Sequence, residues 1–180
     1  MSEILSENSA IIKAKKGEPS AQRYLYDQYR SKWFMICLRY LSNRADAEDA
    51  LQNGLVNIFT KISQFDSNIG EFGHWASRII ANECIQILRK NNKNQIVGEL
   101  KNDLPAAYRE ESAIDKISRK EIMSIIQNLP AGYRMIFNMY VFDGFTHKEI
   151  ASQLNISEGT SKSQLSKARK MLQQSLEVLI

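Results

Sequence analysis

The sequence predicts an all-α protein made of two small helical domains joined by a flexible linker. Eight glycines and three prolines in 180 residues leave few interruptions, which favours long helices. Apolar residues recur at helical spacing, and no segment alternates with period two over a useful length. The periodicity fails over residues 93–117, between expected domains at 1–92 and 118–180. Because structureless loops of that length are uncommon inside one domain, we favour a linker over a long internal loop.

Composition and charge narrow the kind of protein without identifying it. The chain is 43% hydrophobic and has a formal net charge of +4, so a core is expected and an anionic partner is possible but not required. Cys37 and Cys84 lie in apolar helical patterns with no metal-ligand spacing, which suits a reducing compartment. No run reaches the roughly 18 apolar residues that span a bilayer. We expect a cytoplasmic protein with no direct membrane insertion, no metal and no cofactor.

Two helices are expected at the start of the chain. Ser9 is placed to cap a short helix that runs through Lys16 and stops at the segment "GEPS". A long helix follows Pro19. Its apolar stripe consists of Leu25, Tyr29, Trp33, Ile36, Cys37, Tyr40 and Leu41.

Two more helices complete the first domain. The one after the turn "SNRAD" has an expected apolar side of Leu51, Leu55, Ile58, Phe59 and Ile62. The loop "QFDSNIGEFGH", with two glycines and two aromatic residues, opens the next. The residues of that helix at helical spacing are Phe72, Trp75, Ala76, Ile79, Ile80, Ile87 and Leu88.

The second domain is expected to begin with two helices of its own. The segment "SRKE", from Ser118 to Glu121, has the form of a capping box. Pro130 begins another helix, which the "DG" of Asp143 and Gly144 terminates.

A helix-turn-helix follows. Thr146 and Glu149 form a capping box for its first helix, and Asn155 tolerates the left-handed conformation that a tight corner needs. Ser157 is a good N-cap for the second helix. This combination of two capped helices and a tight turn is typical of a DNA-binding unit.

The second helix of the pair, in "SEGTSKSQLSKARK", divides into two faces. Leu165, Ala168, Leu172 and Leu176 form the buried stripe, so Thr160, Ser163, Lys167 and Lys170 point away from it. A helix in the major groove presents N-terminal residues to base edges, while longer cations contact phosphates. A solvated charged face is the alternative, but the capped helix and tight turn before it favour DNA binding.

Two stretches of the first domain and one of the second resemble a known family. "RADAEDALQNGLVNIFTKI" and "FDSNIGEFGHWASRIIANECIQILRK" resemble region two of the extracytoplasmic-function (ECF) group of bacterial sigma factors. "LPAGYRMIFNMYVFDGFTHKEIASQLNISEGTSKSQLSKARKML" resembles their region four. The resemblance implies a protein that binds the RNA polymerase core and directs it to promoter DNA. It also implies contacts with the clamp of the largest subunit and the flap of the second, and an anti-sigma partner.

The helix from Asp46 to Ile62 matches the one that docks on the clamp coiled coil. The matching positions for core binding are Asp49, Gln52, Asn53, Leu55 and Phe59. Asp46, Glu48 and Asp49 would also suit a helix start without any partner, because acids there are favoured by the helix dipole.

The loop "FDSNIGEF" and the helix after it match the family's minus-ten reader. An aromatic-walled pocket with amide donors can capture a base as it leaves the stack. The resemblance assigns Phe65, Asp66, Ser67, Asn68, Ile69 and Gly70 to the pocket, and Arg78, Asn82, Arg89 and Lys90 to the DNA strand. Trp75 falls in the apolar stripe, so we expect it to pack in the core.

The last helix matches the family's minus-thirty-five reader. The matching positions are Thr160, Lys162, Ser163, Gln164, Lys167 and Arg169, and we add Lys170 from the outward face of the helix. Gln164 stands where an arginine is common and can pair bidentately with adenine. Ser161 stands for a usual valine on the buried edge, which we expect to weaken the packing of the two helices.

Three other functions remain as alternatives. A helix-turn-helix activator or repressor that does not bind polymerase core leaves "FDSNIGEFGHW" unexplained, and a helical adaptor leaves the basic face unexplained. An enzyme is the weakest choice, and we expect no catalytic residues. The chain has no Gly-rich phosphate loop, and His74 and His147 both stand at element starts, where solvation is a sufficient role.

Overall fold

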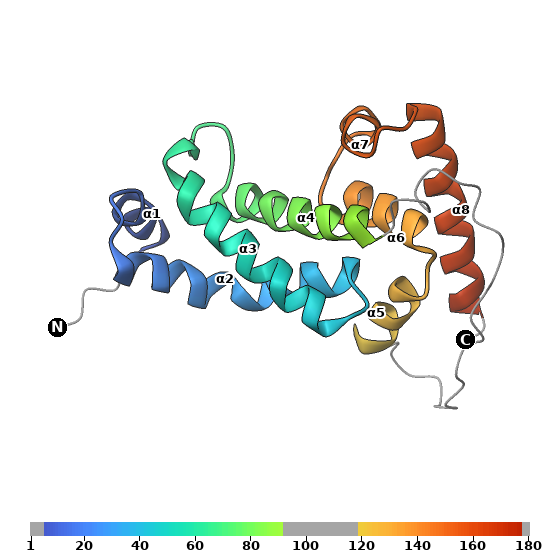
Figure 1. The fold of residues 1–180 in the computed structure, drawn as a ribbon, viewed down its shortest axis with the longest axis horizontal. Coiled ribbons are helices and arrows are strands. Elements are labelled where there is room, and N and C mark those ends of the chain that lie inside the picture. Colours follow the sequence, from blue (N-terminus) through green and yellow to red (C-terminus); the bar gives the residue numbers. More distant parts are fainter. Residues whose placement is uncertain (1–5, 92–118, 178–180) are drawn as a thin grey trace. The chain divides into compact units, whose positions relative to one another are not determined.

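A computed structural model of the chain describes residues 6–91 and 119–177, and every regular element within these ranges is a helix (Figure 1). The all-α prediction is therefore confirmed. The chain divides between Ile87 and Leu88 into two compact units, and each contains buried apolar residues of its own. The expected linker, residues 93–117, and the expected cap Ser118 lie outside the described residues.

The helices of the first unit follow one another with short connections. They are α1 (Glu7–Lys15), α2 (Pro19–Tyr40), α3 (Arg44–Lys61), the 3₁₀ turn η1 (Ile62–Gln64) and α4 (Phe72–Asn91), whose last turn passes the division between the units. Helix α2 packs against both α1 and α3, and η1 contacts α1 and α3. The segment between η1 and α4 carries the candidate minus-ten pocket.

The first helix begins earlier than the sequence analysis predicts. Ser6 is the N-cap, and its side-chain oxygen accepts a hydrogen bond from the amide of Ser9 at 3.3 Å. The expectation that Ser9 caps this helix is wrong, because Ser6 stands one turn ahead and offers the same capping chemistry. The helix ends at Lys15, and Gly17 follows with a φ of 83°, a conformation that favours glycine.

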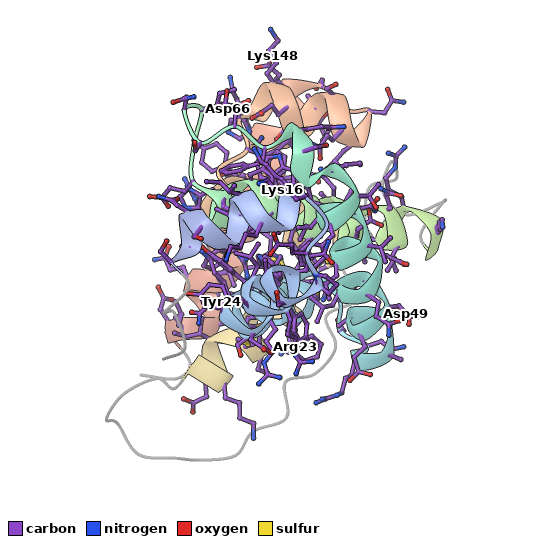
Figure 2. The ribbon with its side chains drawn as sticks, turned by 90° about the vertical axis from the view of Figure 1, so that its left-hand side faces the viewer. Lys16, Arg23, Tyr24, Asp49, Asp66 and Lys148 are labelled. Atoms are coloured by element: carbon purple, nitrogen blue, oxygen red, sulfur yellow. The ribbon has the colours of Figure 1, made fainter. Side chains whose placement is uncertain are left out.

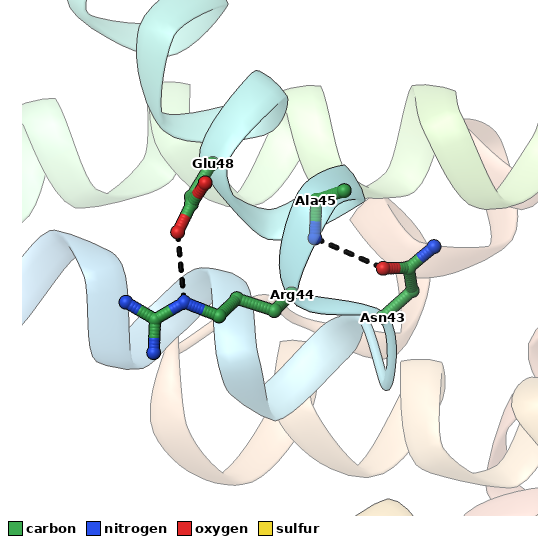
Figure 3. Close-up of polar contacts among 4 residues, drawn as sticks. All are labelled: Asn43, Arg44, Ala45 and Glu48. Atoms are coloured by element: carbon green, nitrogen blue, oxygen red, sulfur yellow. Dashed lines mark hydrogen bonds and ion pairs between the residues drawn. The ribbon is translucent and has the colours of Figure 1, made fainter.

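Helix α3 starts with two local side-chain contacts (Figure 3). The Oδ1 atom of Asn43 accepts a hydrogen bond from the amide of Ala45 at 2.9 Å, which makes Asn43 the N-cap. Arg44 Nε donates to Glu48 Oε1 at 2.8 Å across one helical turn. The predicted helix is present, but it begins at Arg44, inside the "SNRAD" segment.

The buried side of α3 differs from the predicted one. Its buried residues are Ala47, Ala50, Gly54 and Ile58. A Cβ atom on Gly54 would lie 2.4 Å from Cδ1 of Ile80, so α3 and α4 approach closely at this point. Small residues permit that approach, and the larger Leu51, Leu55 and Phe59 are left half-exposed. Their large apolar side chains led to the prediction of a buried stripe. Because the small residues of α3 face α4 at the close approach, these larger residues lie at the edge of the contact between the two helices.

The core of the first unit contains a group of aromatic rings on α2 and α4. Trp33, Tyr40 and Phe72 are almost completely buried, as the predicted stripes require. Tyr29 is half-buried; its ring stacks on Trp33 with centroids 5.2 Å apart, and its hydroxyl donates to Glu7 Oε1 at 2.9 Å. Burial, followed by the bond to Glu7, raises the pKa of Tyr29 from 10.0 to about 12.

Replacing Tyr29 with phenylalanine is expected to reduce the loss of unfolding free energy that the first unit shows as the pH rises above 10. The contribution of Tyr29 is complete below pH 10 and is lost toward pH 12, because the unfolded tyrosine releases its proton first. Chemical unfolding followed by the fluorescence of Trp33 and Trp75 measures the first unit alone, since the chain has two tryptophans. We expect the wild type to lose stability more steeply than Tyr29→Phe between pH 10 and 12. Parallel curves would contradict the assigned environment.

The second unit contains the helix-turn-helix. Its elements are α5 (Arg119–Gln127), α6 (Ala131–Phe137), the π-helical turn η2 (Asn138–Phe142), α7 (His147–Leu154) and α8 (Glu158–Glu177). Helix α8 packs against α5, α6 and α7. Gly144 follows η2 with a φ of 70°, so the "DG" segment ends this helical stretch as predicted.

The predicted caps of the helix-turn-helix are confirmed. Thr146 accepts from the amide of Glu149, while the carboxylate of Glu149 accepts from the amide of Thr146 at 2.8 Å. Asn155 adopts the left-handed conformation, with φ 55° and ψ 49°. Ser157 Oγ accepts from the amide of Thr160 at 2.9 Å, so it caps α8.

Candidate nucleic-acid and polymerase interfaces

Helix α8 presents an exposed basic face. Leu165 and Ala168 are buried, as the wheel predicts, whereas Leu172 and Leu176 near the end of the helix are only half-buried. Thr160 and Gln164 are also half-buried. The fully exposed candidates are Lys162, Ser163, Lys167, Arg169 and Lys170. Four of these five exposed side chains are cations, which is the chemistry required for phosphate contacts.

The polar residues of this face differ in their freedom to bind a ligand. Thr160 Oγ1 lies 2.9 Å from Ser157 Oγ, and Ser163 Oγ donates to the main-chain oxygen of Thr160 at 3.0 Å. Both hydroxyls are therefore engaged within the helix start. The amide of Gln164 makes no hydrogen bond within the part of the chain that the structure describes, so its donor and acceptor remain available.

A chain of contacts holds α8 against the rest of the second unit. Ser161 is fully buried, and its hydroxyl lies 2.9 Å from Nδ1 of His147 at the start of α7. The His147 ring stacks on Tyr140 with centroids 4.5 Å apart, and the Arg169 guanidinium lies 5.9 Å from the centroid of Tyr140. Ser161 thus gains a polar partner where the sequence analysis expected only weaker packing. The contacts orient α8 through both its inner and outer surfaces.

The loop from Phe65 to Glu71, here called the 65–71 loop, has an exposed and internally bonded tip. Asp66 Oδ1 accepts from both the amide and the side-chain nitrogen of Asn68, each at 2.9 Å. Ile69 is 87% exposed. Figure 2 shows Asp66 on this loop, on a different side of the first unit from Asp49. The tip is therefore held in shape by its own hydrogen bonds and exposes the apolar side chain of Ile69 to solvent.

The base of the loop is part of the aromatic core. Phe65, expected in the pocket, is 5% exposed, and its ring centroid lies 5.4 Å from that of Phe72 and 5.5 Å from that of Trp75. Trp75 is half-exposed, so it both packs in this core and reaches the surface. Phe65 therefore packs in the aromatic core and offers little surface to a base. The remaining pocket candidates, Asp66, Ser67, Asn68, Ile69 and Gly70, are all exposed.

One strip of α4 continues from this loop. Arg78 and Asn82 are half-exposed, and Arg89 and Lys90 in the last turn are exposed. Because positions three, four and seven residues apart share a helix face, Trp75, Arg78 and Asn82 lie along one strip. Arg78 and Asn82 therefore share a face of α4 with Trp75, whose ring contacts Phe65 at the base of the loop.

A second exposed surface lies on α3 and is here called the α3 face. It consists of Asp49, Gln52, Asn53, Leu55, Val56 and Phe59. Asp49, Gln52 and Asn53 are exposed, while Leu55 and Phe59 are half-exposed. Val56 is 66% exposed and falls between Gln52 and Phe59 on the helix. An apolar centre with a polar rim is typical of protein-binding surfaces.

Comparisons with known families match both units, in order. The family model for Sigma-70 region 2 matches residues 25–94, and that for Sigma-70, region 4 matches residues 119–172. The ECF RNA polymerase sigma factor SigW of Bacillus subtilis is 28% identical over 186 residues, which cover 94% of this chain and 96% of SigW. The chain belongs to the ECF group of RNA polymerase sigma factors. A second relative of this sigma factor, the ECF sigma-E factor of Haemophilus influenzae, is 23% identical with both chains covered completely.

Solved structures support the fold of the sigma factor. CnrH, in complex with the cytosolic domain of CnrY, matches with a TM-score of 0.53 and 18% identity over 94% of this chain and 96% of CnrH. RpoE of Bartonella quintana, in complex with the anti-sigma factor NepR, matches with a TM-score of 0.55 and 19% identity. The RpoE match covers 87% of this chain and 96% of RpoE. Both comparisons show the same two-part helical fold.

Two features of the sigma factor were missed by sequence reasoning. Val56 could have been found from the helical period, because it lies between Gln52 and Phe59 on the same face of α3. The contact between His147 and Ser161 carried no local signal.

Within the two described ranges, no group of three or more His, Cys, Asp or Glu residues could hold a metal ion. The same residues include no helix long and apolar enough to cross a membrane.

Replacing Ser161 with alanine is expected to lower the free energy of unfolding of the second unit by about 1 kcal/mol, because the His147 nitrogen loses its protein partner. The control is Ser166→Ala, which makes the same change at an exposed site of α8. Circular dichroism follows the unfolding of both units, whereas tryptophan fluorescence follows only the first unit, which contains both tryptophans. The loss of stability should therefore appear in the dichroism curve and not in the fluorescence curve. Equal stability of the two variants would rule out this contribution.

Proposed function

We propose that this sigma factor binds bacterial core RNA polymerase through the α3 face and recognises a promoter through the 65–71 loop, α4 and α8. The observation that carries the proposal is the presence, in one chain, of an α3 face with an exposed apolar centre and a capped helix-turn-helix with a basic outer face. A DNA-binding regulator needs only the second surface. The polymerase supplies the catalysis, and the sigma factor supplies promoter selection in the cytoplasm.

The α3 face suits a protein partner. Val56 forms an apolar centre, and Asp49, Gln52 and Asn53 surround it with exposed polar groups. Such centres contribute most of the binding energy once the rim excludes water. By the family resemblance the partner is the clamp coiled coil of the largest polymerase subunit. A second contact, between the helix-turn-helix unit and the flap of the second subunit, would hold the two units on the same enzyme.

The 65–71 loop suits the capture of a base from the minus-ten element. Its tip offers the main-chain amide of Ser67, the second carboxylate oxygen of Asp66 and the apolar side chain of Ile69. Opening DNA costs a few kcal/mol per flipped base, which contacts of this kind can offset. Arg78 and Asn82 would contact the same strand from α4, and Arg89 and Lys90 would contact phosphates.

Helix α8 suits the major groove at the minus-thirty-five element. Its N-terminal residues Thr160, Ser163 and Gln164 are short or neutral and can approach base edges. Lys162, Lys167, Arg169 and Lys170 are exposed and can reach phosphates on either side. Since the two hydroxyls are engaged within the helix, Gln164 is the strongest candidate for direct base recognition.

An anti-sigma factor is the proposed regulatory partner. RpoE of Bartonella quintana was solved with the anti-sigma factor NepR, and CnrH with the cytosolic domain of CnrY. A partner of this kind would inhibit the present chain by covering the α3 face or α8. Competition between such a partner and core polymerase would then control the amount of active enzyme.

Transcription from a randomised library tests the proposal. Core polymerase and the sigma factor are incubated with promoters randomised in both elements, and the initiated transcripts are sequenced. We expect two separated conserved blocks, one near minus ten and one near minus thirty-five. DNA binding without core-dependent initiation would instead support the alternative of a helix-turn-helix regulator.

A further inference from the structure

Lys15, in the last turn of α1, makes two contacts with the residue that begins the 65–71 loop. Its Nζ atom donates to the main-chain oxygen of Phe65 at 2.6 Å and lies 5.6 Å from the centroid of the Phe65 ring. The donor is charged, which strengthens a hydrogen bond, and the ring face also attracts a cation. Together the contacts restrain both the main chain and the side chain of Phe65.

Helix α1 is itself fixed to the first unit. Ala10, Ile11 and Ala14 are buried, and α1 packs against α2 and η1. Glu7, one end of the helix, accepts the hydroxyl of Tyr29 on α2. Lys15 therefore extends from an anchored element and can restrain the loop.

The tip of the loop depends on its two ends for its orientation. The hydrogen bonds between Asp66 and Asn68 are internal to the tip, and Ile69 is exposed. These bonds give the tip a shape but do not attach it to a helix. One end of the loop continues into α4 at Phe72, and the other is Phe65, which Lys15 contacts.

We propose that Lys15 is a positioning residue that sets the direction in which the 65–71 loop leaves Phe65. This inference rests on the proposed role of the loop in minus-ten recognition. Preorganisation of a binding loop improves discrimination because less ordering remains to be done when the ligand binds. The function of Lys15 is thus to sharpen the choice of base without touching DNA.

A direct phosphate contact by Lys15 would give a different result. Loss of a phosphate contact weakens binding uniformly across sequences and reduces the salt slope by about one. Loss of a positioning residue reduces the preference for the correct base and leaves the salt slope unchanged. The neighbouring Lys16, labelled in Figure 2, is exposed, and its side chain makes no hydrogen bond, ion pair or ring contact among the described residues, so it provides a matched change of charge.

The experiment compares Lys15→Met, Lys15→Arg and Lys16→Met in the full chain with core polymerase. Transcripts are measured from the preferred promoter and from two versions, one with a substitution in the minus-ten element and one in the minus-thirty-five element. We expect Lys15→Met to reduce minus-ten discrimination about threefold to tenfold, with unchanged minus-thirty-five discrimination and salt dependence. Lys15→Arg should retain most of the discrimination, and Lys16→Met all of it. Unfolding curves from tryptophan fluorescence confirm that the variants are compared as folded proteins.

Three results would overturn the inference. Unchanged minus-ten discrimination in Lys15→Met would show that the contact does not position the loop. A uniform loss on all promoters with a shallower salt dependence would make Lys15 a phosphate contact. Absence of minus-ten discrimination in the wild type would overturn the proposed role of the loop as well, and the wild-type control distinguishes that failure from the other two.

Discussion

Replacing Gln164 with arginine is expected to change the preferred base in the minus-thirty-five element from adenine toward guanine. Glutamine pairs bidentately with adenine and arginine with guanine, and one such pair discriminates by about 1–3 kcal/mol, or roughly fivefold to a hundredfold. Gln164 is half-buried on α8, and its amide makes no hydrogen bond within the described residues. Sequencing of transcripts from a library randomised in this element measures the change.

The control for this prediction is Lys167→Ala on the same helix. Lys167 is exposed farther along α8, in a position for phosphate contact. Its loss should weaken binding to all sequences about equally and reduce the salt slope by about one, without altering the preferred base. If Gln164→Arg also left the preferred base unchanged, Gln164 would not contact a base edge.

Replacing Val56 with aspartate is expected to weaken binding to core polymerase at least about tenfold, because a charge would be desolvated at the centre of the α3 face. Val56 is 66% exposed, so the stability of the free sigma factor should change little. Titration of fluorescently labelled sigma factor with core polymerase measures the affinity. Tryptophan unfolding curves measure the stability of the first unit.

The matched control is Ile12→Asp on α1. Ile12 is also an exposed β-branched residue of the first unit, 58% exposed, and the change introduces the same charge. Core affinity should remain near that of the wild type. A similar loss in both variants would indicate that added negative charge, and not the α3 face, determines the effect.

Local patterns predicted the helices of the second unit and the caps of its helix-turn-helix well. The capping box of Thr146 and Glu149, the left-handed Asn155 and the N-cap Ser157 all depend on residues within one turn of each other. Interactions of that range are visible in a sequence because helical spacing determines which groups meet. The same reasoning correctly divided the middle of α8 into buried and exposed sides.

Contacts between distant segments could not be predicted in this way. Lys15 and Phe65 are separated by 50 positions, and His147 and Ser161 by 14. The packing of α3 was mispredicted because Gly54, which carries no apolar side chain, lies at the close approach to Ile80. The wheel of α8 indicated Thr160, Ser163, Lys167 and Lys170, and the other candidate DNA and polymerase residues came from the family resemblance. The structure gives their exposure and local bonds, and their roles remain proposals.

Transcription from one selected promoter tests the central claim most directly. Core polymerase alone, the chain alone and the two together are compared on that promoter and on a version with both elements scrambled. We expect initiated transcripts only when core and chain are combined, and only from the intact promoter. Binding of the chain to the promoter with no transcripts in the combined reaction would contradict its function as a sigma factor.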